Sequence, residues 1–285
     1  MISIQKVAAI SFSEDDRYQE LELRRFLCIA NWLRVELHIV VAENRAKKVE
    51  ARLRYLRNEI GSERSVFIFQ VRGLETREVI EAMDATAPDL MILESVDWKL
   101  IPVLFEKAKV PVMLLPDPYG STAIIPRSLI VPLSSEERKS DALELALSFA
   151  ERSKTPVDLM HVMGKGIEGE KDELSLETVS DQFHHEYSKI VDRAVAIASP
   201  LSTSSEKKWI RSYYRCSGPI SEQIARIASR RGTSAIILDW HGTLAPGRAR
   251  LIKQLLLESA HPIVLVKQGK KARMSLKVGK ELKSA

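Results

Sequence analysis

The chain repeats itself along its 285 residues. Glu94 stands 21 positions after Gly73 in the first half, and Asp239 stands 21 positions after Gly218 in the second. Self-similarity at a matched interval indicates that one structural unit occurs twice. The length also lies near that of two domains of about 150 residues each. We therefore predict two similar units in tandem, with a short connecting turn, over residues 1–118 and 125–268.

Other landmarks recur in the same order in both halves. An opening apolar run ends near Ser13 in the first half and near Ser134 in the second. A second apolar run follows, and it carries His38 or His161 close to its end. Each half closes on a short apolar run behind a proline, at residues 112–115 and 263–266.

Strand-like and helix-like segments alternate through both halves. Continuously apolar strands such as 90–93 and 235–238 are typical of a parallel sheet that helices cover on both faces. With right-handed crossovers, the pattern predicts an α/β fold of two tandem doubly wound, five-stranded parallel sheets, which is Rossmann-like. The expected strands cover residues 7–12, 35–41, 66–71, 90–93, 112–115, 129–133, 157–163, 209–215, 234–238 and 263–266. The expected helices cover residues 15–33, 47–60, 76–85, 137–152, 176–198, 221–230 and 248–258.

Composition and charge indicate the compartment of the protein and the classes of partner that it lacks. Cys28 and Cys216 occupy unmatched positions without metal-ligand spacing, which favours a reduced, cytoplasmic protein. Neither an export signal nor an apolar stretch of about 18 residues is evident, so we expect no membrane span. The net charge of +5 comes from the basic residues at the C-terminus, where we expect residues 269–285 to form a disordered tail. The remaining body is about neutral, so we expect no nucleic-acid partner.

Several runs in the second half resemble the universal stress protein family. They include residues 129–137 with the helix that follows, Leu-Met-His-Val at 159–162, Gly218-Pro219, His241-Gly242 and 261–266. The resemblance covers nearly the whole chain as a tandem pair, with fewer matches in the first half. It implies the fold of adenine nucleotide alpha hydrolase-like proteins and a role in stress response. It also implies edge-to-edge association through the last strands, so 112–115 and 263–266 could pair in an intramolecular pseudo-dimer, with a homodimer as a further alternative.

The chain departs from this family where ATP would bind. ATP-binding members have an aspartate at the end of the first strand, and here those positions are Ser13 and Ser134. The family's Gly-x-x-Gly after the fourth strand begins with Glu94 in one half and with Asp239 in the other. A carboxylate beside a triphosphate repels it. We therefore predict no cofactor, and keep ATP in the second half as the alternative.

The best candidate site is the loop at residues 240–250. It follows a strand at the carboxyl edge of a parallel sheet, where ligands bind in this architecture. Two arginines near the start of the next helix are unfavourable there, and a bound anion would relieve them. The simpler alternative is that both arginines point into water. The candidate cofactor-binding residues are Ser134, Gly242, Thr243, Gly247, Arg248 and Arg250.

Other chemistry-bearing residues have structural interpretations. His184-His185-Glu186 lacks the spacing of a zinc site and is expected on a solvated helix face. His38 and His161 are expected to be partly buried, Trp98 and Trp240 to pack over the sheet edge, and Cys28 to lie in the core. No nucleophile with an evident base appears, so an enzyme is not supported.

The leading hypothesis is a cytoplasmic tandem universal stress protein that acts as a regulatory or interaction module on an unknown protein partner, with a degenerate nucleotide site. One alternative is an adenine-nucleotide sensor that uses the second half. Another is a regulatory module that works beside a membrane transporter, since similar domains occur fused to carriers and the basic tail could meet anionic lipid.

Overall fold

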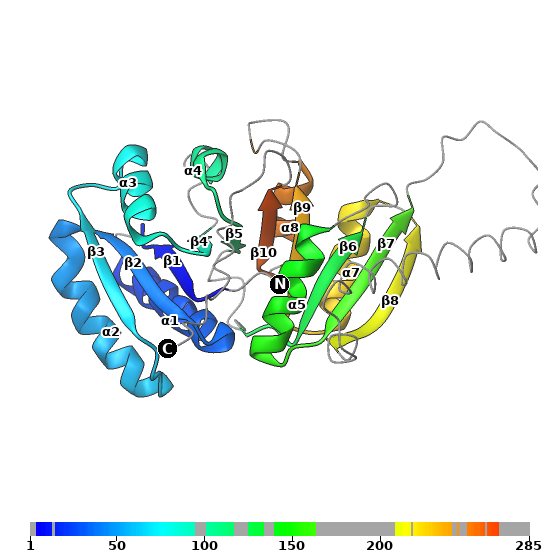
Figure 1. Cartoon of the computed structure of the whole chain (residues 1–285), viewed down its shortest axis with the longest axis horizontal. Coiled ribbons are helices and arrows are strands. Elements are labelled where there is room, and N and C mark those ends of the chain that lie inside the picture. The colour runs from blue at the N-terminus through cyan, green and yellow to red at the C-terminus, as the bar shows by residue number, and fades with distance from the viewer. Residues whose placement is uncertain are drawn as a thin grey trace, which may run out of the picture.

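A computed structural model describes residues 4–12, 15–94, 101–116, 125–133, 140–163, 209–217, 219–240, 244, 250–259 and 261–267. The strands in these ranges form a single ten-stranded sheet with the order β3-β2-β1-β4-β5-β10-β9-β6-β7-β8. Helices cover the sheet on both faces, and the two halves of the chain lie side by side along it (Figure 1). The predicted α/β architecture with mostly parallel strands is therefore confirmed.

The elements follow the predicted alternation in both halves. The first half contains β1 (Lys6–Ile10), α1 (Asp16–Leu33), β2 (Glu36–Ala42), the 3-10 turn η1 (Glu43–Arg45), α2 (Ala46–Ile60), β3 (Val66–Val71), α3 (Thr76–Thr86), β4 (Leu90–Glu94), α4 (Ile101–Lys107) and β5 (Val112–Leu115). The second half contains β6 (Ser128–Leu133), α5 (Asp141–Ser153), β7 (Val157–Met163), β8 (Ile210–Ser217), α7 (Ile220–Arg230), β9 (Ser234–Trp240), α8 (Arg250–Ser259) and β10 (Ile263–Lys267).

The two halves join through their closing strands. Strand β5 pairs with β10 in antiparallel register, with Ile263 opposite Leu114 and Leu265 opposite Val112. The neighbouring pairs β4·β5 and β9·β10 are parallel. The pairing of 112–115 with 263–266 was predicted, and it turns two five-stranded units into one continuous sheet.

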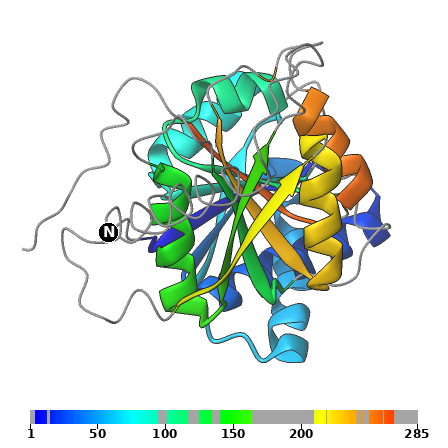
Figure 2. The same ribbon diagram turned by 90° about the vertical axis from the view of Figure 1, so that its right-hand side faces the viewer.

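Two apolar cores run along the sheet, one on each face. Helices α1, α2 and α5 bury residues such as Phe26, Leu53 and Phe149 against one face, in a cluster that continues across both halves. Helices α3, α4, α7 and α8 cover the other face. Seen from the end of the second half, α5 lies on one side of the sheet, and α7 and α8 lie on the other (Figure 2). This double cover explains why the central strands are apolar throughout.

Side chains also hold the halves together on both faces. The Trp32 indole N–H donates to the Thr155 hydroxyl at 2.9 Å, and its ring meets Phe149 edge-on at 5.7 Å. On the other face, Lys267 Nζ donates to the carbonyls of Phe105 and Glu106, at 3.0 and 2.6 Å, at the end of α4. The contact between the halves is therefore a packed interface as well as a strand pair.

Some predicted boundaries were wrong. Helix α4 was not predicted, because its seven residues carry a single apolar turn formed by Ile101, Leu104 and Phe105. Helix α5 begins at Asp141 rather than at 137, and β9 continues to Trp240 rather than ending at 238. The expected helix 176–198 and the expected tail 269–285 lie outside the described residues.

Candidate functional site

The region of interest is the carboxyl edge of each half, where β4 or β9 and the first strand of that half end. Ligands settle at this edge in open parallel sheets, because helix N-termini and loops converge there. Glu94 is the last residue of β4, and Asp239 is the penultimate residue of β9. The structure shows what each of these two carboxylates contacts.

In the first half, Glu94 is held in a buried ion pair. Arg25 Nη1 on α1 donates to Glu94 Oε2 at 2.9 Å and also to the carbonyl oxygen of Pro116 at 2.8 Å. Arg25 is 4% exposed and Glu94 is 2% exposed. A buried charge is tolerated only when it is paired and hydrogen-bonded, so these two groups depend on each other. The guanidinium therefore ties α1 to the ends of β4 and β5.

A second buried carboxyl group lies at the carboxyl edge of the first half. Glu22 on α1 is fully buried and accepts from the Ser11 hydroxyl at 2.5 Å and from the Phe12 N–H at 3.2 Å. Burial raises the pKa of Glu22 to about 7, although both hydrogen bonds favour the ionised form. The segment just after β1 is thus bonded to the protein's own helix.

Helix α1 reaches further over the edge than its counterpart α5 does. The C-caps are Arg34 and Lys154; α1 begins 18 residues before its cap, and α5 begins 13 residues before its own. Counting back from these caps, Glu22 matches Ala142, and Arg25 matches Leu145. The extra first turn of α1 is therefore particular to the first half. So are Glu22 and Arg25, the two buried charged residues that follow this turn in α1.

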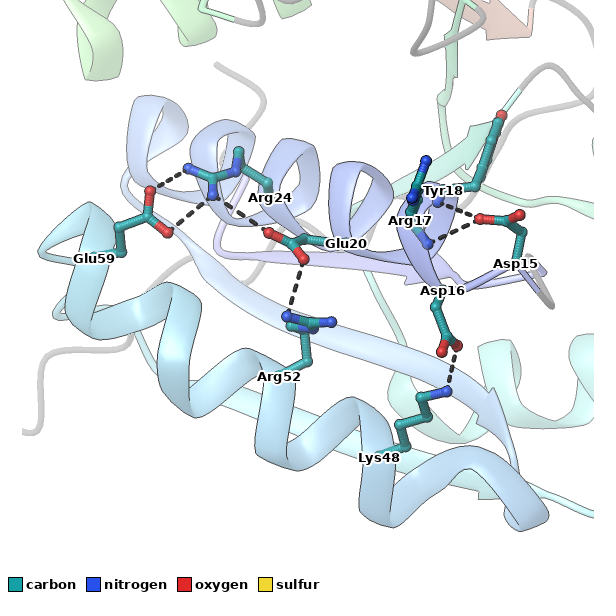
Figure 3. A network of polar contacts seen from close by, with 9 residues as sticks. All are labelled: Asp15, Asp16, Arg17, Tyr18, Glu20, Arg24, Lys48, Arg52 and Glu59. Carbon is teal, nitrogen blue, oxygen red and sulfur yellow. Dashed lines mark hydrogen bonds and ion pairs between the residues drawn. The ribbon is translucent and has the colours of Figure 1, made fainter.

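Exposed ion pairs fasten this extra turn to α2. Asp16 pairs with Lys48, and Glu20 pairs with Arg52 at 2.9 Å (Figure 3). The Asp15 carboxylate caps the helix by accepting from the N–H groups of Arg17 and Tyr18. A carboxylate at this end is favourable because it meets the positive end of the helix dipole.

In the second half, Asp239 is engaged at the start of α5. Its carboxylate accepts from the Ser140 hydroxyl at 2.6 Å and from the Ala142 N–H at 3.0 Å. Ser140 in turn caps the helix, because its Oγ accepts from the Leu143 N–H at 3.0 Å. A helix N-terminus attracts anions, and here an anion of the protein itself already contacts it.

The sequence-predicted site is only partly placed. Ser134, Gly242, Thr243, Gly247 and Arg248 lie outside the described residues. Arg250 is the first residue of α8, and its side chain also lies outside the described part. The acidic positions Glu94 and Asp239 do lie at the two carboxyl edges, as predicted.

The two histidines, the tryptophan and the cysteine considered in the sequence have burial and contacts typical of structural residues. His38 is 7% exposed and its ring contacts the rings of Phe67 and Phe69, and burial lowers its pKa. His161 is partly buried, with Nδ1 at 3.2 Å from the Leu133 carbonyl oxygen. Trp240 packs against the core, as predicted. Cys28 is half-buried, so its placement in the core was wrong.

Four further residues from the sequence analysis are not described. Trp98 and the His184-His185-Glu186 run lie outside the described ranges. Within those ranges, His, Cys, Asp and Glu side chains form no group suited to a metal ion. None of the helices described has the length and apolar character needed to cross a bilayer.

Sequence reasoning missed Glu22, Arg25 and Ser140. A signal was present for the first two, because they stand among Leu23, Phe26 and Ile29 on the face of α1 that points to the core. Charged residues within an apolar helical stripe must be buried with partners, and Glu94 was an available partner for an arginine. Ser140 stands directly before a helix, where serine is a favoured N-cap.

Comparison with known proteins identifies the family of the second half. A model of the Universal stress protein family matches residues 126–267. The second half of the chain therefore belongs to the universal stress protein family. A comparison with curated proteins gives no match.

Solved structures extend the fold to the whole chain. A universal stress protein from Archaeoglobus fulgidus is 12% identical, with 92% of this chain and 98% of that chain covered and a TM-score of 0.57. A functionally unknown protein from Pseudomonas aeruginosa is 14% identical over 93% of this chain and 92% of its own, with a TM-score of 0.60. Both halves thus share the fold of tandem universal stress proteins, although only the second matches the family in sequence.

Proposed function

We propose that this universal stress protein is a non-catalytic regulatory module that acts through contacts with a partner protein, and that its nucleotide site is degenerate. Membership of the family supports a role in stress response. The observation that carries the proposal is the buried pair between Arg25 and Glu94. It joins three elements at the edge where a ligand of the first half would bind.

The carboxyl edge of the first half is unfavourable for the binding of a polyphosphate. Glu94 already holds its cation, and Glu22 lies on the same helix one turn away from Arg25. Opening this edge would leave buried charges without partners, which is strongly unfavourable. A polyphosphate would also meet two carboxyl groups there.

In the described part of the second half, fewer contacts occupy the carboxyl edge, and they involve Asp239 and the start of α5. The Asp239 carboxylate accepts from the Ala142 N–H and from the Ser140 hydroxyl, which are two donors at the start of α5. A phosphate approaching those donors would have to displace a like charge. This supports the absence of ATP from the second half as well.

Nucleotide binding by the second half is the competing function. It is favoured by the family match, which covers this half alone, and by the retained Gly242. In that case an adenine nucleotide would be bound by an altered loop that includes Thr243, Gly247, Arg248 and Arg250.

Thermal unfolding with ATP separates the two functions. We expect no shift of the unfolding midpoint at millimolar ATP, and no nucleotide in mass spectra of the denatured purified protein. Asp239→Asn keeps the side-chain shape and removes the charge, so a shift that appears only in this variant would identify the carboxylate as the excluding group. Glu94→Gln is the matched change in the first half, where we expect no ATP effect. A clear shift in the unmodified protein would contradict the proposed function and favour the sensor.

A further inference from the structure

The two outer edges of the sheet are built differently. Strand β8 carries Arg211 and pairs irregularly with β7, with a register shift between Val157 and Asp158. Charges and bulges of this kind keep a sheet edge from pairing with other strands. Strand β3 has the sequence Val-Phe-Ile-Phe-Gln-Val, without a charge or a proline, and none of its residues is fully buried. Within the part of the chain that the structure describes, the edge at β3 therefore has neither of these protections.

The register shows which backbone groups of β3 are open. The Leu37 N–H donates to the Ser65 carbonyl at 3.0 Å, and Leu37 stands opposite Val66. In a parallel pair, alternate residues of a strand bond to its neighbour, so Phe67 and Phe69 continue the ladder to β2. The N–H and C=O groups of Val66, Ile68 and Gln70 then point away from the sheet.

A groove runs beside this edge, between β3 and α2. It has a volume of about 440 Å³, and its lining includes Leu53, Val66 and Ile68 together with the charged residues Glu50, Arg54 and Arg57. The Nε atom of Arg57 is buried without a hydrogen-bond partner. On the other face of the strand, the Phe67 side chain is 46% exposed.

We propose that the β3 edge binds an extended segment of a partner protein, which adds a strand to the sheet. Acidic side chains of that segment face α2 and meet Arg54 and Arg57. Apolar side chains alternate with them and pack beside Phe67. Strand addition of this type draws affinity from main-chain hydrogen bonds and specificity from alternate side chains.

Charge argues for an acidic partner rather than for a second copy of this chain. The charged lining of the groove consists of Arg54, Arg57 and Glu50, with Glu50 at 3.4 Å from Arg54, so the lining carries one net positive charge. A two-fold pair through β3 would place two such linings on the same face of the joined sheet, where they would repel each other. The C-terminal segment of this chain is also basic in sequence, so it has the same sign as the groove.

Binding of defined peptides to the full chain tests this surface. A short fluorescein-labelled peptide of alternating Val and Glu is titrated by fluorescence anisotropy against a matched peptide of alternating Val and Lys. We expect the acidic peptide to bind and the basic one not to bind. Gln70→Pro removes one outward N–H and should weaken binding by up to about tenfold, the worth of one hydrogen bond. Arg54→Glu should weaken binding of the acidic peptide further.

Control variants keep the result interpretable. The Arg54 side chain is 76% exposed, so Arg54→Glu reverses its charge without disturbing the fold. This variant still tests the proposal if Gln70→Pro unfolds the edge strand. Lys47→Glu makes the same charge change on α2, at a residue that does not line the groove, and should leave affinity unchanged. Equal binding of both peptides, or unaltered affinity in Gln70→Pro and Arg54→Glu, would overturn the proposal. Self-association that Gln70→Pro abolishes would overturn it too, in favour of a second copy.

The inference rests on the proposed function only in that the chain acts through a partner. The ATP experiment reports on the carboxyl edges, which lie away from the groove beside β3. Failure of peptide binding would therefore leave the degenerate nucleotide site standing, and an ATP-dependent shift would leave the β3 edge standing.

Discussion

The two halves of the molecule share one topology but close their carboxyl edges with different chemistry. The first half uses a buried arginine and two buried carboxyl groups, Glu22 and Glu94. At the positions matching Glu22 and Arg25, the second half has Ala142 and Leu145, and its own carboxylate at Asp239 contacts the start of α5 instead. The fold therefore determines where such an edge lies, while side chains of the first helix and of the strands β4 and β9 determine which polar contacts are made there.

The largest effect is expected from breaking the buried pair of the first half. Arg25→Ala leaves Glu94 buried without its cation, and the loss of one partner of a buried pair costs about 3–5 kcal/mol. Urea unfolding measures the change in the free energy of unfolding. Leu145→Ala is the matched truncation on α5, and it removes apolar contacts without leaving a buried charge unpaired.

A double variant sharpens this result. Arg25→Met with Glu94→Gln removes both charges and should recover much of the stability that Arg25→Ala loses, because no buried charge is left unpaired. If Arg25→Ala costs no more than the loss of an exposed pair, the Arg25–Glu94 ion pair does not hold α1 to the ends of β4 and β5.

The architecture was largely predictable from the sequence, because the repeat and the continuously apolar strands such as β4 and β9 leave few alternatives. The pairing of β5 with β10 was also foreseen. Helix α4 was not, since a single apolar turn in a short segment resembles a loop.

The contacts at the site were much less predictable. Glu94 and Asp239 were recognised by their position in the repeat, but their partners were not. Glu22 and Arg25 lie in a helix rich in charged residues, and most of its other charged side chains are at least partly exposed. Periodicity places Glu22 and Arg25 in the apolar stripe of α1, but it does not show which groups they contact. Only the tertiary position of α1 over the ends of β1 and β4 supplies those partners.

The next effect is expected in the pH dependence of the free energy of unfolding. It arises from Glu22 in the first half, which matches Ala142 in the second. The pKa of Glu22 is raised in the fold from 4.5 to about 7, so the folded state holds this proton more tightly than the unfolded state does. The stability that follows is fully present below about pH 4.5 and is lost as the pH rises through about 7. Glu22→Gln should remove this loss and be more stable than the unmodified chain at pH 8, by at most about 3 kcal/mol.

Unfolding of both forms at pH 5 and pH 8 provides the measurement. Arg25 and Arg45 also act on the Glu22 carboxyl, and both stay charged over this range. Burial lowers the pKa of His38 and of His261, which gives a trend of opposite sign, but both histidines are present in both proteins. Equal pH slopes for the two forms would show that the Glu22 carboxyl does not titrate in this window.

A smaller effect is expected at the cap of the second half. Ser140→Ala removes the acceptor for the Leu143 N–H and one donor to Asp239, and loss of a serine N-cap costs about 1–2 kcal/mol. Asp15→Ala is the matched change at the start of α1, where the cap is exposed and should contribute less. Thermal unfolding of the two variants compares them directly. A larger loss for Asp15→Ala would mean that Asp239 contributes little to holding the start of α5.

The smallest effect is expected from the exposed ion pairs that fasten the extra turn of α1 to α2. Glu20 lies between Arg24 and Arg52, all three side chains are about one-third exposed, and pairs of this kind contribute less than about 1 kcal/mol. Arg52→Ala should therefore change the free energy of unfolding only slightly, and the change should shrink as salt screens the charges. Arg77→Ala on α3, which breaks a pair with Glu81 within one helix, is the control. A loss for Arg52→Ala that matches Arg25→Ala and persists in high salt would mean that the position of α1 over the edge depends on its outer surface rather than on the buried Arg25–Glu94 pair.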